Sequence, residues 1–244
     1  MPLKGRTLII TRPHKSSGGA AAELKRNGAR VISAPLIRIA PPRTWRPLER
    51  ALNSLIRFDV VVFTSVNAVD SFFARLKKRP FSPRVLAAVG HATRQAVEKR
   101  GLRCTLVPDD ARSSGLAKAL RVPRGSRVLI PRAERGLNLL PNALRKKGAL
   151  VTVVPCYRTL PDLAGRRTLR RALIKGADAV LFASGSAAKL GAADVKLYGA
   201  AAVAIGPTTA AALRSRGVIP AAVSKAPDPK SFAAAAVLAL RGRP

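Results

Sequence analysis

The stretch RVLIPRAERGLNLLPNALRKKGALVTVVPCYRTLP, residues 127–161, decides the fold of this chain. The apolar run Val128–Ile130 is too short for a helix and predicts a strand, and the β-branched run Val151–Val154 predicts a second one. A proline follows each run, Pro131 and Pro155, and we expect each strand to end there. Between them three leucines recur at helical spacing, and a glycine supplies the left-handed residue that ends a helix. These residues are Leu137, Leu140, Leu144 and Gly148.

The same pattern occurs near the N-terminus, as GRTLIITRPHKSSGGAAAELKRNGARVISAPLIRI (residues 5–39). A shift of 120 residues places Arg12 on Arg132 and Gly28 on Gly148. Two later pairs of segments also repeat in the same order: 58–68 returns as 177–187, and 87–102 returns as 203–218. The chain is therefore predicted to be a duplication, with a period too long for a solenoid.

Strands that alternate with short helices predict an α/β fold of two similar domains, each a parallel sheet with helices on both faces. Two proline-bearing connectors, 40–43 and 161–167, are the expected crossings between the domains. They predict a discontinuous first domain, 1–37 with 163–244, a second domain, 42–158, and linkers at 38–41 and 159–162. Two sequential domains that split near residue 122 are the competing division.

The composition is strongly basic, with 45 Lys and Arg against 12 Asp and Glu, a net charge of +33. Such a charge attracts polyanions, so nucleic acid, an anionic membrane and a polycarboxylate substrate all stay open as partners. The basic residues are spread over every predicted helix, as on a solvated surface. The apolar run 232–240 is far shorter than the ~20 residues of a membrane span, and no signal peptide is visible. We expect a cytoplasmic monomer with no membrane association.

Several kinds of site have no support in the sequence. Neither standard nucleotide-binding glycine motif is present, and two histidines form no cluster with metal-ligand spacing. Nucleic-acid-binding motifs are missing as well. Cys104 and Cys156 are expected to be reduced residues buried in strands.

The turn between a strand and the N-terminus of the next helix contains small polar residues at several places in the chain. These turns are the candidates for a binding site. Ligands of open α/β sheets bind outside the carboxyl ends of the strands, where helix N-termini favour carboxylate or phosphate. Arg12 and Arg132 follow equivalent strands and could add charged hydrogen bonds. Helix capping explains a single Ser or Thr equally well. The candidate residues are Thr64, Ser65, Asn67, Gly90, Ser184, Gly185, Ser186, Gly206, Pro207, Thr208 and Thr209.

Two domains whose candidate corners face one another would form a cleft for one ligand with several anionic groups. Tyr157, where the central unit enters the connector, could donate a proton or a hydrogen bond into such a cleft. The alternative is an aromatic residue that packs at the hinge.

With these residues in place, the chain resembles the uroporphyrinogen-III synthases over nearly its whole length. The resemblance rests on ordered motifs: LIITRP (8–13), GARVISAPLIRI (28–39), FDVVVFTSVNAV (58–69), VLIPRAERG (128–136), GALVTVVPCYRT (148–159) and AIGPTTAAAL (204–213). It implies two α/β domains joined by a two-stranded linker, the first built from both chain ends, and an enzyme without a cofactor or metal.

The implied substrate is hydroxymethylbilane, a linear tetrapyrrole with eight carboxylates, which is cyclised with inversion of ring D. By resemblance, Tyr157 assists departure of the substrate hydroxyl, and the turns at Thr64, Ser184 and Thr208 contact substrate. Ala183 stands where the first repeat has Thr64, which weakens the case for a hydroxyl there. The alternative is a non-enzymatic two-domain module that binds an anionic ligand.

Overall fold

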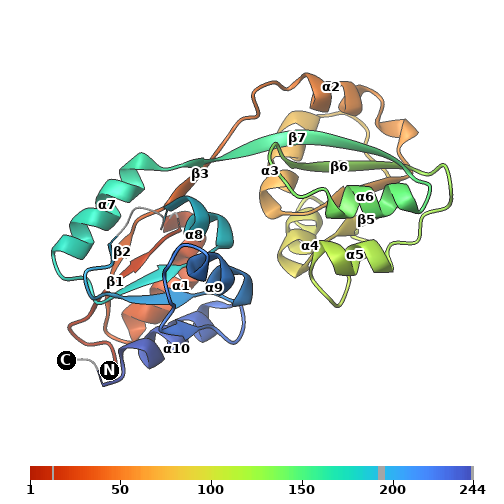
Figure 1. Ribbon diagram of the computed structural model, residues 1–244. Coiled ribbons are helices and arrows are strands. Elements are labelled where there is room, and N and C mark those ends of the chain that lie inside the picture. Colours follow the sequence, from red (N-terminus) through yellow and green to blue (C-terminus); the bar gives the residue numbers. More distant parts are fainter. Residues whose placement is uncertain (13, 192–195, 243–244) are drawn as a thin grey trace. The chain divides into compact units, whose positions relative to one another are not determined.

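A computed structural model describes residues 1–12, 14–191 and 196–242 (Figure 1). The chain forms two compact units. Unit 1 is Met1–Arg38 with Leu160–Pro244, and unit 2 is Ile39–Thr159. Both boundaries fall inside strands, β3 (Ile37–Ala40) and β7 (Leu150–Pro161), which are neighbours in one sheet. The predicted linkers, 38–41 and 159–162, overlap the ends of these two strands, and residues 41 and 162 lie outside them.

Unit 1 is a five-stranded sheet in the order β10-β9-β8-β1-β2 with parallel pairing. Its strands are β1 (Thr7–Ile10), β2 (Arg30–Ser33), β8 (Ala179–Phe182), β9 (Ala201–Ala204) and β10 (Ala222–Val223). Its helices are α1 (His14–Arg26), α7 (Leu163–Ile174), α8 (Gly185–Gly191), α9 (Pro207–Arg214) and α10 (Pro229–Leu240).

Alternate residues of the unit 1 strands enter two cores, because successive side chains of a strand point to opposite faces. Leu8 and Leu181 pack against α1 and α10, whereas Ile9 and Val180 pack against α7, α8 and α9. Helices therefore cover both faces of the sheet (Figure 1).

Unit 2 repeats this plan with the sheet order β3-β7-β6-β4-β5. Its remaining strands are β4 (Val60–Phe63), β5 (Val85–Ala88) and β6 (Arg127–Ala133). Its helices are α2 (Arg46–Asn53), the 3-10 turn η1 (Leu55–Arg57), α3 (Val66–Leu76), α4 (His91–Glu98), α5 (Ser113–Ala119) and α6 (Leu139–Lys146). One core lies under α2, α3 and α4, and the other lies under α5 and α6. The predicted α/β class, with parallel sheets between layers of helices, is confirmed.

The two prolines of the central unit do not end their strands, which corrects the prediction. β6 continues through Pro131 to Ala133, and β7, 12 residues long, continues through Pro155. The pairing of β6 with β4 covers Val128 and Leu129, ahead of the proline, while the ladder with β7 runs on to Tyr157. Proline has no backbone N–H to donate. Where the neighbouring strand does not pair with it, the sheet therefore loses no hydrogen bond.

Three further expectations were wrong in detail. Leu137 precedes α6 and is 86% exposed, so it is not part of the apolar face of the helix. Residues 163–167 of the predicted connector form the first turn of α7, where Asp162 accepts a hydrogen bond from the Gly165 N–H at 2.9 Å. Cys104 lies outside the strands, beside an isolated bridge between Ala87 and Leu106.

Both thiols are free and buried, as expected. Cys156 lies in β7, and burial raises the pKa of its thiol to about 12. Burial also raises the pKa of Cys104. Within the described ranges, no helix has the length and apolarity required to span a bilayer.

Candidate functional site

The predicted site residues gather at one edge of each sheet. All strand pairs with a described register are parallel, so the carboxyl ends of β1, β8 and β9 meet at one edge of unit 1. The carboxyl ends of β4, β5, β6 and β7 do the same in unit 2. The strand order reverses between β1 and β8 in unit 1 and between β4 and β6 in unit 2. Such switch points are where open α/β sheets bind ligands.

Tyr157 lies near the end of β7, and its hydroxyl is 3.0 Å from Oγ of Ser65. The ring packs into the core under α2, α3 and α4, and 8% of the residue is exposed. The ring thus packs as a core residue. The phenol oxygen, in contrast, is hydrogen-bonded to Ser65, at the carboxyl edge of the sheet. This contact joins residues 92 positions apart in the sequence.

Ser65 and Ser184 occupy equivalent positions of the two repeats, and both cap helices. Oγ of Ser65 accepts from the Ala68 N–H at 3.2 Å, and Oγ of Ser184 accepts from the Ala187 N–H at 3.1 Å. The capping interpretation therefore holds for both serines. Ser65 differs because it also contacts the phenol of Tyr157.

Glu134 is a residue of this edge that the sequence did not indicate. Its N–H donates to the Tyr157 carbonyl at 2.8 Å, and its carboxylate accepts the Arg43 N–H at 3.0 Å and lies 3.4 Å from the Arg43 guanidinium. Arg158 donates from Nε to the Pro41 carbonyl at 2.8 Å. These bonds fasten the segment after β3 to β7, at the residue next to Tyr157, and to Glu134, the residue that follows β6. A lone glutamate in a basic loop gave no signal of this role.

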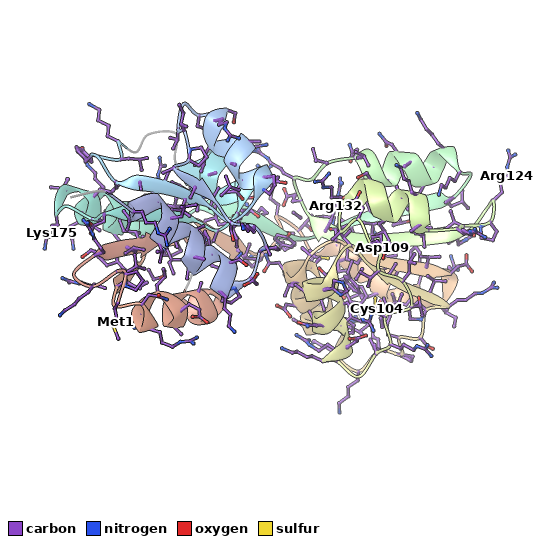
Figure 2. The ribbon with its side chains drawn as sticks, turned by 90° about the horizontal axis from the view of Figure 1, so that it is seen from below. Met1, Cys104, Asp109, Arg124, Arg132 and Lys175 are labelled. Atoms are coloured by element: carbon purple, nitrogen blue, oxygen red, sulfur yellow. The ribbon has the colours of Figure 1, made fainter. Side chains whose placement is uncertain are left out.

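Arg132, labelled in Figure 2, is a cation that neutral groups hold in place. It donates to the Leu137 carbonyl at 2.5 Å and to Oδ1 of Asn138 at 2.8 Å. Its buried Nε has no acceptor among the described residues. Burial, together with the nearby charge of Arg145, lowers the pKa of Arg132. Because no carboxylate of the described residues pairs with it, its charge is available to an anionic ligand.

Arg12 has a similar environment at the edge of unit 1. Its Nη2 donates to the Ala183 carbonyl at 2.9 Å, and burial lowers its pKa. Thr11, which the sequence did not indicate, connects β1 to β8 beside it. The Thr11 hydroxyl donates to the Leu181 carbonyl at 3.0 Å and accepts from the Ala183 N–H at 3.2 Å. Thr11 aligns with a proline in the second repeat, so the repeat gave no hint of this role.

The turns after β8 and β9 are adjacent. A Cβ at Gly185 would lie 3.7 Å from the Thr208 carbonyl oxygen, which places the two predicted corners of unit 1 in near contact. Gly206 begins α9 in an extended conformation and Gly90 begins α4 likewise, and neither helix N-terminus has a side-chain cap from the described part of the chain. Their first N–H groups are therefore free of side-chain acceptors there.

The remaining candidates differ in exposure. Ser186, Pro207 and Thr208 are exposed, whereas the Thr209 residue is 3% exposed and its N–H is bonded to the Gly206 carbonyl. Thr64 is half-buried beside Ser65, and Asn67 lies in the first turn of α3. Across the ranges that the structure describes, no group of three or more His, Cys, Asp and Glu side chains could hold a metal ion.

Replacement of Arg132 by Met tests whether this cation binds an anion. A hydrogen bond to a charged group contributes about 1.5–3 kcal/mol, so we expect KM for an anionic substrate to rise about 10- to 100-fold while kcat changes less. Arg135→Met is the matched control, because Arg135 lies three residues further along, after the end of β6, and is exposed. Equal kinetics of the two variants would contradict a binding role for Arg132.

Comparison with known proteins identifies the family. The family model described as uroporphyrinogen-III synthase HemD matches residues 19–234. A uroporphyrinogen-III synthase of Synechococcus elongatus is 34% identical over 164 residues, 65% of this chain and 62% of the relative. A porphyrin biosynthesis protein HemD of Ruminiclostridium josui is 29% identical over 224 residues, 87% of this chain and 44% of the relative. The chain thus spans less than two thirds of the length of each of these relatives.

A solved structure shows the same fold. The crystal structure of a mutant uroporphyrinogen III synthase from Thermus thermophilus matches with a TM-score of 0.69 and 23% identity, over 97% of this chain and 99% of the other. Because the family model matches residues 19–234, most of the sequence, the chain belongs to the uroporphyrinogen-III synthase family.

Proposed function

We propose that the chain is a uroporphyrinogen-III synthase, a lyase that cyclises hydroxymethylbilane with inversion of ring D and loss of water, in the biosynthesis of haem and other tetrapyrroles. The observation that carries the proposal is the family match over residues 19–234, a range that contains every predicted site residue except Arg12. The carboxyl edges of the two sheets supply the groups that this substrate requires.

Carboxylate binding is the first requirement, because the substrate carries eight carboxylates. In unit 1, Arg12 and the N-terminus of α9 at Gly206 are assigned to bind substrate carboxylates. In unit 2, Arg132 and the N-terminus of α4 at Gly90 are assigned the same role. Support comes from the lack of side-chain caps on these two helices in the described ranges and from the neutral acceptors of both guanidinium groups. Helix N-termini and arginine forks are both suited to carboxylates.

Departure of the substrate hydroxyl is the second requirement. We assign to the Tyr157 phenol a hydrogen bond to this hydroxyl, which leaves as water once it has gained a proton. Ser65 keeps the phenol oxygen at the edge by its own hydrogen bond. The pyrrole nitrogen electrons expel the water, and the electron-poor methylene bonds to the substituted α-carbon of ring D. The bond from that carbon to the methylene beside ring C then breaks, and this methylene bonds to the free α-carbon of ring D. Loss of one proton from that carbon restores the pyrrole and balances the proton gained by the departing hydroxyl. Substrate and product differ only by water, so the proposal contains no redox partner, group donor or cofactor.

Selection of the substrate conformation is the third requirement. A linear bilane can close without help to the isomer whose ring D is not inverted. The protein therefore has to hold one conformation and stabilise charge in it, rather than supply a strong acid. Fixed groups on rigid strand ends, such as the serine caps and the bonds of Glu134, are suited to this task.

A non-enzymatic module that binds an anionic ligand is the second candidate. The buried ring of Tyr157 and the capping roles of both serines favour it, because each has a purely structural explanation. The two proposals differ in turnover. Hydroxymethylbilane is incubated with the protein, and the products are oxidised and separated as isomers III and I. An enzyme yields isomer III, and a module that only binds yields isomer I at or below the rate of the blank. The cytoplasmic, monomeric state stays a prediction.

A further inference from the structure

A cavity of about 570 Å³ lies in unit 2 away from the candidate site. It is open to solvent on one side and is lined by residues 79–83, in the loop that follows α3, and by five residues at the end of α2 and around η1: Leu52, Asn53, Leu55, Ile56 and Phe58. Phe58 precedes β4 and Pro83 precedes β5, each by two residues, so the cavity is at the amino edge of the sheet. A strand of four residues spans about 13 Å, which separates this edge from Ser65 and Tyr157.

The larger part of the lining is apolar, and Asn53, Arg79 and Ser82 contribute polar groups. Phe58 and Phe81 face it together with Leu55 and Ile56, and Ile56 is 98% exposed. A large aliphatic side chain in water at the mouth of an apolar cavity is typical of a binding surface rather than of a core. The volume is within the range of sites for small molecules, about 300–1,000 Å³.

Contacts of the lining residues with α2 and α3 keep the two walls of the cavity in place. The carboxylate of Glu49 in α2 accepts hydrogen bonds from Arg75 at 2.8 Å and from Arg79 at 2.9 Å. Phe81 packs against Phe72, with ring centroids 5.3 Å apart and the rings tilted by 57°. α2 and the loop are thus tied to one another and to α3, so the cavity exists before any ligand binds, and binding requires little reorganisation.

The two segments that contribute to the lining are rich in basic residues, and Arg79 belongs to the lining itself. Residues 49–59 and 77–84 contain six basic residues and two acidic ones, Glu49 and Asp59. Arg79 is paired with Glu49, whereas the side chains of Lys77, Lys78 and Arg84 have no ion-pair partner within the described ranges. Lys77 ends α3 with φ of 54°, an uncommon conformation for a residue with a Cβ, which directs this end of the helix into the loop.

We propose that this cavity is a binding site for an amphipathic carboxylate of low molecular weight. The apolar body of the ligand lies against Phe58 and Phe81, and its carboxylate lies at the rim beside Lys78 and Arg84. An apolar interior with a few convergent charges is the usual composition of such sites. The proposal does not depend on the reaction assigned to the carboxyl edge, because the two sites share no residue.

The test uses 8-anilinonaphthalene-1-sulfonate, an aromatic anion that fluoresces in apolar sites, with octanoate and octanol as competitors. We expect one saturable site from which octanoate displaces the probe at a concentration at least tenfold below that of octanol. Asn53→Trp and Ser82→Trp fill the cavity from opposite walls at positions on its lining, and each is expected to weaken probe binding at least tenfold. Lys78→Glu is expected to weaken octanoate binding more than octanol binding.

Lys175→Glu is the matched control for charge, since Lys175 projects from unit 1 (Figure 2) and should leave probe affinity within twofold of the wild type. Circular dichroism establishes whether each variant is folded. If one of the two tryptophan variants does not fold, the other is sufficient for the test. Unchanged probe affinity in a folded tryptophan variant, or an equal loss in Lys78→Glu and Lys175→Glu, overturns the proposal and assigns probe binding to the net charge of the protein. Isomer III production by the wild type is measured separately and has no bearing on this outcome.

Discussion

Tyr157→Phe is expected to lower kcat for formation of isomer III by about 100-fold, the effect of removing one positioned hydrogen-bond donor that stabilises charge in the transition state. The substitution removes the phenol oxygen, which is 3.0 Å from Oγ of Ser65, and leaves the ring in its apolar core. The lost hydrogen bond contributes about 1 kcal/mol to stability, so the variant should remain folded. The rate is measured with hydroxymethylbilane at saturating concentration, and folding is measured by thermal denaturation.

The chain offers a matched control for this variant. Tyr198 is the second of its two tyrosines, lies in unit 1 and is 57% exposed, so Tyr198→Phe removes the same atom from a different environment. We expect its kcat to equal that of the wild type. A Tyr157→Phe enzyme as fast as the Tyr198→Phe enzyme would mean that Tyr157 is only a packing residue.

Gly165→Ala is expected to lower the free energy of unfolding of unit 1 by about 3 kcal/mol or more, at the top of the usual range for overpacking. A Cβ at this position would lie 1.7 Å from the carbonyl oxygen of Pro35 and 2.7 Å from its carbonyl carbon. Both are backbone atoms, so no side-chain rotation relieves the clash. The first turn of α7 has to move away from the segment between β2 and β3, which disturbs the Asp162 N–H bond to the Leu36 carbonyl.

The melting temperature measures this effect. For a chain of this size about 1 kcal/mol corresponds to 2–4 °C, so a fall of about 6–12 °C is expected. Gly185→Ala is the control, because a Cβ there meets its nearest atom at an ordinary 3.7 Å. If Gly165→Ala melts within about 1 °C of the Gly185→Ala protein, α7 adapts without cost and the close approach to Pro35 does not constrain the fold.

The arrangement of the strands could be predicted because it depends on local patterns that occur twice. Apolar runs such as Val60–Phe63 and Ala179–Phe182 are fully buried on both faces of a parallel sheet, so they stand out in the sequence. The order of the motifs also indicated the family, which the comparisons confirm. Pro131 and Pro155 were misread because the effect of a proline depends on the partner strand, which the sequence does not specify.

The candidate site was predictable only in part. Strand ends at equivalent positions of a repeat must reach the same edge of a parallel sheet, which is why Ser65 and Arg132 could be grouped. The contact of Ser65 with Tyr157 depends on β7 lying two strands away from β4, a fact of topology. Thr11 and Glu134 escaped notice because their partners are backbone groups far away in the sequence.

The isomer composition of the product tests the central claim most directly. Hydroxymethylbilane is mixed with the wild-type protein, the reaction is stopped before the protein-free blank has converted appreciably, and isomers III and I are separated and quantified. The account predicts that isomer III dominates and that its amount rises in proportion to protein concentration. Isomer I alone, formed at the rate of the blank at every protein concentration, would contradict it.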